Sequence, residues 1–430
     1  MVGVESRPGE VTVAGAGVGL YRWVIVAMLF AATAINYVDR QMIGVLKPTL
    51  SKELSWSEGN YANIVFWFQV AYAIGYLSFG RIVDLIGVRS GYALAIVIWT
   101  ISHLGHGLAT GVTSFATARF GLGIGESGNF PSGVRAVTDW FPQRERALAI
   151  GIFNAGANVG AIITPLLVPA LVLAFGWCSA FCITGVLGIA WLLTWWLIYR
   201  HPNVHPRVTP TELAWIRQDP PDRTLKVPWI VLICRRETWA YALGKFLIDP
   251  IWWFYLFWLP GYLFNRYHLD LKTFGLPLAV VYLISDLGSI AGGFVSSRLI
   301  AVGRSANVAC KIAMASCALL ITPIWATQSI DSLWGATLLI GLATAAHQAF
   351  SANLYTFPSD VFPRGAVGSV VGIGGAVGAL GGMGMALFTG YVLDTTGSYR
   401  ALFAICATSY ALALLVVHML SPRLDPARLG

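Results

Sequence analysis

Twelve stretches of about twenty mainly apolar residues run through this chain, and they restrict its fold more than any other feature of the sequence. A helix that crosses the hydrocarbon core of a bilayer needs about 20 such residues. Lipid offers no hydrogen bonds, so long apolar segments satisfy their own backbone as helices. The stretches lie near residues 23–46, 61–80, 91–109, 113–134, 147–173, 177–199, 239–264, 276–297, 308–327, 333–357, 367–390 and 401–420. The sequence therefore predicts an all-α membrane protein with twelve transmembrane helices.

The composition agrees with a lipid environment. Hydrophobic residues make up 57% of the 430 residues and charged residues only 11%, whereas soluble domains carry about a quarter charged residues. A soluble fold would have to expose much of this apolar surface to water. This excludes a soluble enzyme, a nucleic-acid-binding protein and a secreted domain. The six cysteines have no paired spacing and are expected to pack as small apolar side chains.

The longest polar stretch, residues 200–236, divides the spans into two groups of six. We expect an N-terminal tail at 1–20, a six-helix half at 21–199, a linker at 200–236, a second half at 237–421 and a tail at 422–430. Two such halves, with the substrate held between them near the midplane, are typical of secondary transporters. The proline-rich linker is expected to be a passive hinge.

The basic residues predict the orientation. Most of the 28 Lys and Arg residues fall in the linker, in the tails and in the loops on that side. Cytoplasmic loops collect Lys and Arg, so both termini are expected in the cytoplasm. The net charge of +8 is explained by these loops and does not indicate a nucleic-acid partner.

Two apolar spans carry charged residues. The first contains Asp39 and Arg40, and the fourth contains Arg119 and Glu126. Inserting a charged residue at the bilayer centre costs at least ~2.5–3.5 kcal/mol of free energy, so such residues indicate a structural or functional role. Arg119 and Glu126 are two helical turns apart and share a face, so the four groups can form one cluster. The cluster is either a set of structural ion pairs or a pair of proton carriers, because the protonation of buried carboxylates responds to neighbouring charges.

Lys245 in the seventh span is a third intramembrane cation. It either faces the substrate or pairs with Asp249, which is four residues further along the same helix. Trp253 follows in an aromatic run and can stack on a sugar face. Asp286 is a weaker polar candidate.

For several other polar residues, helical periodicity does not determine whether the side chain points toward the substrate. They are Asn154 and Asn158 in the fifth span and His347, Gln348 and Asn353 in the tenth. Any of them that points inward can recognise substrate hydroxyls.

Two groups of residues are given no chemical role. His103 and His106 lie near the outer end of the third span. The glycine runs at 121–125, 156–160 and 368–382 have transmembrane flanks and are expected to be helix-packing surfaces, not phosphate-binding loops.

The loop after the second span reads Gly80-Arg-Ile-Val-Asp84-Leu-Ile-Gly87-Val-Arg89. It resembles the inner-loop motif of the major facilitator superfamily, Gly-x-x-x-Asp-x-x-Gly-x-Arg. The resemblance implies two pseudo-symmetric six-helix halves. Asp84 is expected to cap a helix or pair with an arginine and so hold the inner gate shut in one state.

Further segments resemble the anion:cation symporter branch of that superfamily, and bacterial hexuronate transporters within it. They are the segments that begin at Asn36 (Asn-Tyr-x-Asp-Arg-Gln), at Ala71 (Ala-Tyr-Ala-Ile-Gly), at Phe153 (Phe-Asn-Ala-Gly) and at Gly244 (Gly-Lys-Phe-Leu-x-Asp-Pro).

The resemblance implies the roles of individual residues. Asp39 and Glu126 would carry protons, and Arg40 would bind the substrate carboxylate. Tyr37 and Tyr72 would line the site, to which Arg119 is added as a further cation. Galactonate-type relatives have Gln where this chain has Lys245, which suggests a different anion or a different pose.

The resulting expectation is a proton-coupled importer of glucuronate or galacturonate in the bacterial inner membrane. It is expected to be monomeric, with the proton as coupling ion and with no other cofactor and no metal. A galactonate, tartrate or aromatic-acid carrier is the alternative. The chain has no zinc-protease motif and no nucleophile elbow, so a membrane enzyme is disfavoured. A sensor with the transporter fold is a further alternative, against which the intact acidic pair argues.

Overall fold

The computed structural model describes residues 19–219 and 227–423, and all regular elements in these ranges are helical. The predicted tails, 1–20 and 422–430, lie outside the described residues except for two residues of each. The elements are α1 (Tyr21–Glu53), α2 (Glu58–His106), α3 (Val112–Ser127), α4 (Asn129–Trp140), α5 (Gln143–Ile198), η1 (Pro202–Val204), α6 (Pro210–Ile216), α7 (Trp229–Ile233), α8 (Arg236–Arg266), α9 (Gly275–Ala301), α10 (Ala306–Ile321), η2 (Thr322–Ser329), α11 (Leu333–Val361), α12 (Arg364–Thr396) and α13 (Arg400–Leu420).

The twelve predicted spans are all present. Eight helices in the described part of the chain are long and apolar enough to cross a membrane. Two of them, α2 with 49 residues and α5 with 56, each contain two spans, because at about 1.5 Å per residue each exceeds twice the hydrocarbon thickness. The consecutive helices α3 and α4 form the fourth span, and the 31-residue α8 forms the seventh.

Glycines divide the two merged helices. Gly87 has a φ of 80° and Gly176 a φ of 79°, a conformation that residues with a Cβ avoid. The predicted pairs of spans, 61–80 with 91–109 and 147–173 with 177–199, fall on either side of these two glycines. Position 87, which belongs to the predicted gating motif, thus needs glycine because its backbone has a positive φ.

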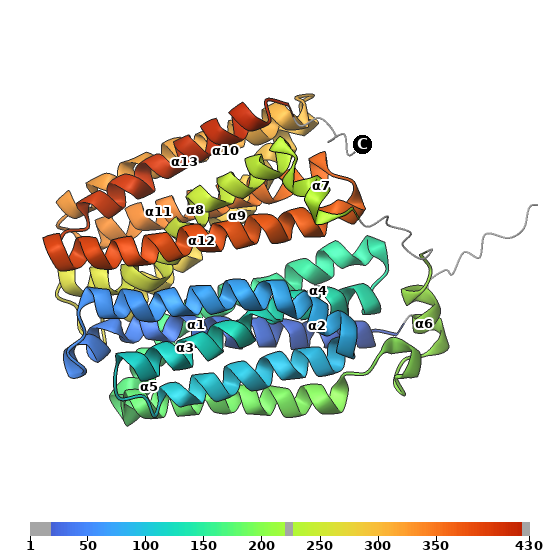
Figure 1. The fold of residues 1–430 in the computed structure, drawn as a ribbon, viewed down its shortest axis with the longest axis horizontal. Coiled ribbons are helices and arrows are strands. Elements are labelled where there is room, and N and C mark those ends of the chain that lie inside the picture. Colours follow the sequence, from blue (N-terminus) through green and yellow to red (C-terminus); the bar gives the residue numbers. More distant parts are fainter. Residues whose placement is uncertain (1–18, 220–226, 424–430) are drawn as a thin grey trace, which may run out of the picture.

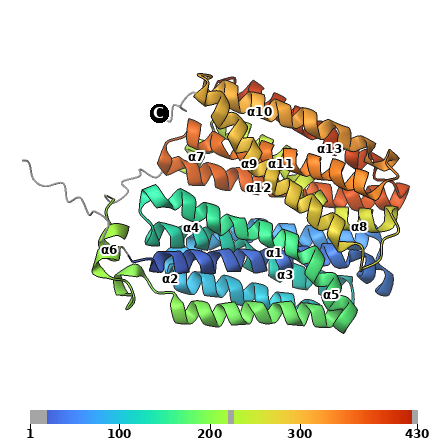
Figure 2. The same ribbon diagram turned by 180° about the vertical axis from the view of Figure 1, so that it is seen from behind.

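The helices form two bundles. Helices α1–α5, coloured blue to green, make one half, and α8–α13, coloured yellow-green to red, make the other (Figures 1 and 2). Large apolar side chains such as Leu197, Ile290 and Leu319 are exposed on the outside, as expected where lipid is the solvent.

Polar contacts join the two halves at the end of the molecule away from the linker, called the far end below. The carboxylate of Asp394, on α12, accepts hydrogen bonds from the backbone N–H groups of Glu58 (2.8 Å) and Gly59 (2.7 Å) at the start of α2. The Tyr61 hydroxyl donates to the carbonyl of Phe257 on α8 (2.9 Å). We call the contact of Asp394 with Glu58 and Gly59 the far-end latch.

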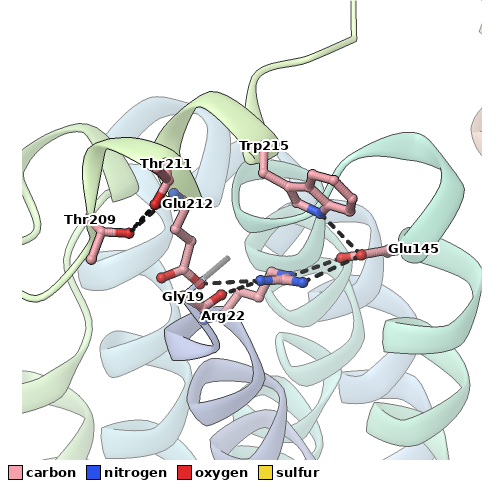
Figure 3. A network of polar contacts seen from close by, with 7 residues as sticks. All are labelled: Gly19, Arg22, Glu145, Thr209, Thr211, Glu212 and Trp215. Carbon is pink, nitrogen blue, oxygen red and sulfur yellow. Dashed lines mark hydrogen bonds and ion pairs between the residues drawn. The ribbon is translucent and has the colours of Figure 1, made fainter. Parts of the chain in front are cut away.

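The linker is fastened to the first half, as Figure 3 shows. Arg22 at the start of α1 forms ion pairs with Glu145 of α5 (2.9 Å) and with Glu212 of α6 (3.4 Å). Trp215 of α6 donates to Glu145 (3.1 Å), and Glu212 is only 1% exposed. The linker is thus anchored at α6, which a simple loose hinge would not require.

Candidate functional site

The four intramembrane charges of the first half form one buried cluster where α1 and α3 meet, as their spacing predicts. Arg119 and Glu126 on α3 are fully buried, and Asp39 and Arg40 on α1 are 1% and 5% exposed. Nε of Arg40 lies 2.7 Å from Oε2 of Glu126. Nη2 of Arg40 also donates to Oδ1 of Asn36 (3.1 Å). Arg40 therefore pairs with the acid of the other helix and not with its neighbour Asp39.

Glycines allow α3 to approach α2 closely enough to place this cluster. A Cβ on Gly125 would lie 2.4 Å from the backbone nitrogen of Trp99, and one on Gly123 would lie 2.4 Å from the carbonyl oxygen of Phe68. Likewise, Gly156 of α5 packs against the backbone of α1. These runs are packing surfaces, as predicted.

The same prediction is wrong for part of the eleventh span. No described atom comes within 4 Å of a Cβ built on Gly368 or Gly372, so this pair does not form a close helix contact. Gly378, in contrast, packs closely against Asp249.

Aromatic rings from both halves enclose the Arg40 guanidinium. Its central carbon lies 4.9 Å from the ring centres of Tyr37 and Tyr72, and 5.7 Å from that of Trp253. Tyr37 and Tyr72 belong to the first half, whereas Trp253 lies on α8. Rings at this distance stabilise a cation through their faces. The predicted residues Tyr37, Arg40, Tyr72 and Trp253 thus meet at one place between the halves.

The Arg119 guanidinium lies near this enclosure, and only part of its N–H groups have hydrogen-bond partners. Its Nη2 donates to the carbonyl of Arg40 (2.9 Å), and its guanidinium lies 4.7 Å from the ring centre of Phe68. Its Nε and Nη1 have no hydrogen-bond partner among the described residues. An unsatisfied buried donor is costly, so this position favours a nearby negative charge.

Asp39 faces His103, for which the sequence indicates no chemical role. Its Oδ1 lies 3.2 Å from Nε2 of His103, which is completely buried on α2. The same Nε2 lies 2.7 Å from the hydroxyl of Thr184 on α5. A lone histidine near the end of an apolar span gives no sequence signal for this contact, because the contact depends on how α1, α2 and α5 pack.

Lys245 is buried on α8 and already has partners. Its Nζ lies 2.8 Å from Oδ2 of Asp249 and 2.5 Å from the hydroxyl of Tyr355 on α11. The pairing with Asp249 is one of the two arrangements the sequence allowed. It leaves open whether a substrate oxygen shares this lysine.

Two further predicted binding residues, His347 and Asn353, form their polar contacts within the second half. His347 stacks on Trp252 and contacts the Tyr410 hydroxyl (2.6 Å) within the second half. The Asn353 amide donates to the carbonyls of Gly292 and Ala349.

The amide side chains of Asn154, Asn158 and Gln348 form no hydrogen bond within the described ranges. Asn154 is exposed and the other two are partly exposed. Their predicted roles remain predictions.

The gating motif lies at the linker end. Asp84 pairs with Arg135 of the same half (3.3 Å), and both side chains are about half exposed. Arg89 donates to the carbonyl of Trp196 and lies 4.5 Å from its ring centre. A Cβ on Gly80 would meet no described atom within 4 Å.

The fold and the buried charged site between two six-helix halves define a membrane transporter. A model of the Major Facilitator Superfamily matches residues 29–385, and the chain belongs to this superfamily. It is therefore a transporter and not an enzyme.

The chain is also similar to individual transporters of known substrate and to a solved structure. The chain is 31% identical to the hexuronate transporter of Escherichia coli K12 over 92% of this chain and 93% of that protein. It is 28% identical to the D-galactonate transporter of Escherichia coli O6:H1 over 98% of this chain and 100% of that protein. A solved bacterial homologue of the human lysosomal transporter Spinster has the same fold, with a TM-score of 0.71, 18% identity and coverage of 94% and 96% of the two chains.

Proposed function

We propose that this transporter is a proton-coupled symporter that imports a hexuronate, either glucuronate or galacturonate, by alternating access. The observation that carries the proposal is the Arg40–Glu126 ion pair inside an aromatic enclosure to which both halves contribute. A guanidinium binds a carboxylate through paired, planar hydrogen bonds. A substrate carboxylate must therefore compete with Glu126 for Arg40.

This competition couples the proton to the substrate. When Glu126 takes up a proton, it no longer neutralises Arg40, and a buried cation without a partner is unstable. The substrate carboxylate supplies the missing negative charge. Proton binding and substrate binding then favour each other, and by linkage the effect is reciprocal. Asp39 is the second proposed proton carrier, and the proton is the only coupling ion or cofactor proposed.

Lys245 is proposed to bind the far oxygens of the substrate from the second half. It lies eight residues before Trp253 on α8, about 12 Å along the helix axis. A sugar acid that spans part of this distance contacts both halves. Asp249 must then share Lys245 with the substrate, because the two side chains are already 2.8 Å apart.

We propose that the structure is the state that is closed at the far end and accessible from the linker end. The far-end latch closes one end, while Asp84 and Arg135 are half exposed at the other. The similar Spinster homologue is described as inward-facing, which supports this assignment. With the linker in the cytoplasm of a bacterium, the site faces inward across the inner membrane, and one chain suffices for transport.

Uptake into proteoliposomes tests the function. Labelled glucuronate is expected to accumulate when the outside is acidic and to equilibrate only when the pH is equal on both sides. Unlabelled galacturonate should compete at concentrations similar to glucuronate, and galactonate at higher ones. Failure to accumulate glucuronate, combined with accumulation of galactonate, would replace the hexuronate with the alternative sugar acid. No dependence on the pH gradient for either would refute the proton coupling.

A further inference from the structure

His103 and His106 are two buried titratable groups that the proposed mechanism has not used. They lie three residues apart at the end of α2, are completely buried, and have ring centres 6.1 Å apart. Residues three apart share a helix face, so both rings lie on one side of the third span. Buried histidine in a membrane span is costly and marks ion or proton paths.

The hydrogen bonds indicate which nitrogen carries the proton in each ring. Nδ1 of His106 lies 2.8 Å from the carbonyl of Ser102, which only accepts, so Nδ1 carries the proton. The Thr184 hydroxyl donates to the carbonyl of Ala180 (3.0 Å) and therefore accepts from Nε2 of His103. This leaves Nε2 of His106 and Nδ1 of His103 as bare lone pairs.

Both lone pairs are buried without a hydrogen-bond partner in the described ranges. A buried histidine that only packs is expected to have both ring nitrogens hydrogen-bonded, because an unsatisfied buried acceptor is costly. The free nitrogens therefore favour a role in accepting protons. The charged groups next to the pair are Asp39 on α1, which contacts His103, and Arg119 on α3, which lies near both rings; Glu126 on α3 lies near Asp39. From α5 the pair meets Thr184 and the ring of Phe181, neither of which titrates in the accessible range.

The two histidines lie between the far end of the molecule and the charged cluster. His106 is the last residue of α2, and two residues later Leu108 is 83% exposed at the far end. His103 lies one turn deeper and touches Asp39. The far-end surface, His106, His103 and Asp39 therefore follow one another toward the charged cluster.

We propose that His106 and His103 form the entry path that delivers the coupling proton from the far end to Asp39. His106 accepts a proton on Nε2 and passes it to Nδ1 of His103, through a ring rotation or one bridging water. The His103 cation then gives its Nε2 proton to Oδ1 of Asp39, 3.2 Å away, which leaves a neutral ring with its proton on Nδ1. A flip of the His103 ring, or exchange of the proton through a water, restores the Nε2–H form before the next proton enters. This inference rests on the proposed proton coupling at Asp39.

The test compares His103→Gln with Asp39→Asn in proteoliposomes. Gln can keep a hydrogen bond to Thr184 but cannot be protonated. Two rates are measured for each variant: glucuronate accumulation with the associated proton flux under an imposed pH gradient, and counterflow exchange at equal pH. His418→Gln, on the exposed end of α13, is the matched control and should behave as the unaltered protein.

If the path is used, His103→Gln lowers the gradient-driven substrate and proton fluxes together, on the order of tenfold, and leaves counterflow within about twofold. His106→Gln should show the same split. Equal losses in flux and counterflow would overturn the proposal, because exchange needs a folded, moving carrier but no net proton entry. Unchanged flux in His103→Gln, with flux abolished in Asp39→Asn, would also overturn it while leaving the proposed function intact. Absence of any proton flux in the unaltered protein would refute the proposed function itself.

Discussion

Replacing Asp394 by Asn is expected to shift the transporter toward a state that is open at the far end. In the structure its two carboxylate oxygens each accept a backbone N–H at the first residues of α2, and this contact joins the two halves. Asn keeps one accepting oxygen but loses the second bond and the charge. The negative charge also interacts favourably with the positive N-terminus of the helix.

The magnitude follows from these two losses. One net hydrogen bond contributes about 0.5–1.5 kcal/mol, and an anion at a helix N-terminus about 0.3–1 kcal/mol. Asp394 is exposed, so solvent and salt reduce both contributions, and about 1 kcal/mol in total is the reasonable value. A change of this size alters the ratio of far-end-closed to far-end-open molecules about fivefold. High salt should reduce the difference.

Pulsed electron paramagnetic resonance measures this ratio. Spin labels are placed at Lys52 and Lys272, which are exposed at the far end in different halves, after the native cysteines are replaced. Asp394→Asn should increase the long-distance population about fivefold relative to the short one. Asp331→Asn is the matched control, because Asp331 pairs with Arg266 inside the second half and does not bridge the halves.

Gly59→Ala tests the same contact from the other side. A Cβ there would lie 2.6 Å from Oδ2 of Asp394, so the methyl group should displace the carboxylate and produce a similar shift. If neither Asp394→Asn nor Gly59→Ala changes the distance distribution, the latch does not stabilise the closed far end. An equal change in the Asp331→Asn control would show that the effect is a general one of surface charge.

Three further outcomes are expected. Lys245→Gln should weaken hexuronate binding in calorimetry by about one to two decades, the worth of one charge-assisted hydrogen bond; full rescue by adding Asp249→Asn would show that Lys245 is only a counter-ion. Glu212→Gln, which weakens the anchoring of the linker, should lower thermal stability and transport rate while the ratio of rates for competing sugar acids stays unchanged; a changed preference would contradict a passive linker. Gly87→Ala should cost about 1–3 kcal/mol, because its φ of 80° is strained for alanine, and should lower the unfolding temperature; Gly80→Ala, with open space around its Cβ, is the control and should not.

The charged cluster was predictable from spacing, but its pairing was not. Seven residues place Arg119 and Glu126 on one face of a helix, and this brought both to α1. Asp39 and Arg40, adjacent in sequence, are rotated about 100° from one another on a helix, so they face different neighbours. Arg40 meets α3 and Asp39 meets His103 of α2. Only the interhelical packing decides this.

The span count was predictable because lipid imposes a length on each helix, while contacts between the halves left no local pattern. The far-end latch joins residues 58–59 to residue 394, and the linker anchor joins residue 22 to residue 212. Each is a polar residue at a helix end, where such residues are common in any protein. The Gly368/Gly372 spacing did not produce a close helix contact, because small residues permit such a contact without requiring it.

The Glu126→Gln variant tests whether Glu126 carries the coupling proton. The variant keeps the size and hydrogen-bonding ability of the side chain but cannot exchange a proton, and Gln does not neutralise Arg40. In proteoliposomes with an acidic exterior, the unaltered protein should concentrate labelled glucuronate. Glu126→Gln should fail to concentrate it and should still exchange internal for external substrate in counterflow. Continued accumulation of glucuronate by Glu126→Gln, driven by the pH gradient, would contradict the assignment of Glu126 as the proton carrier.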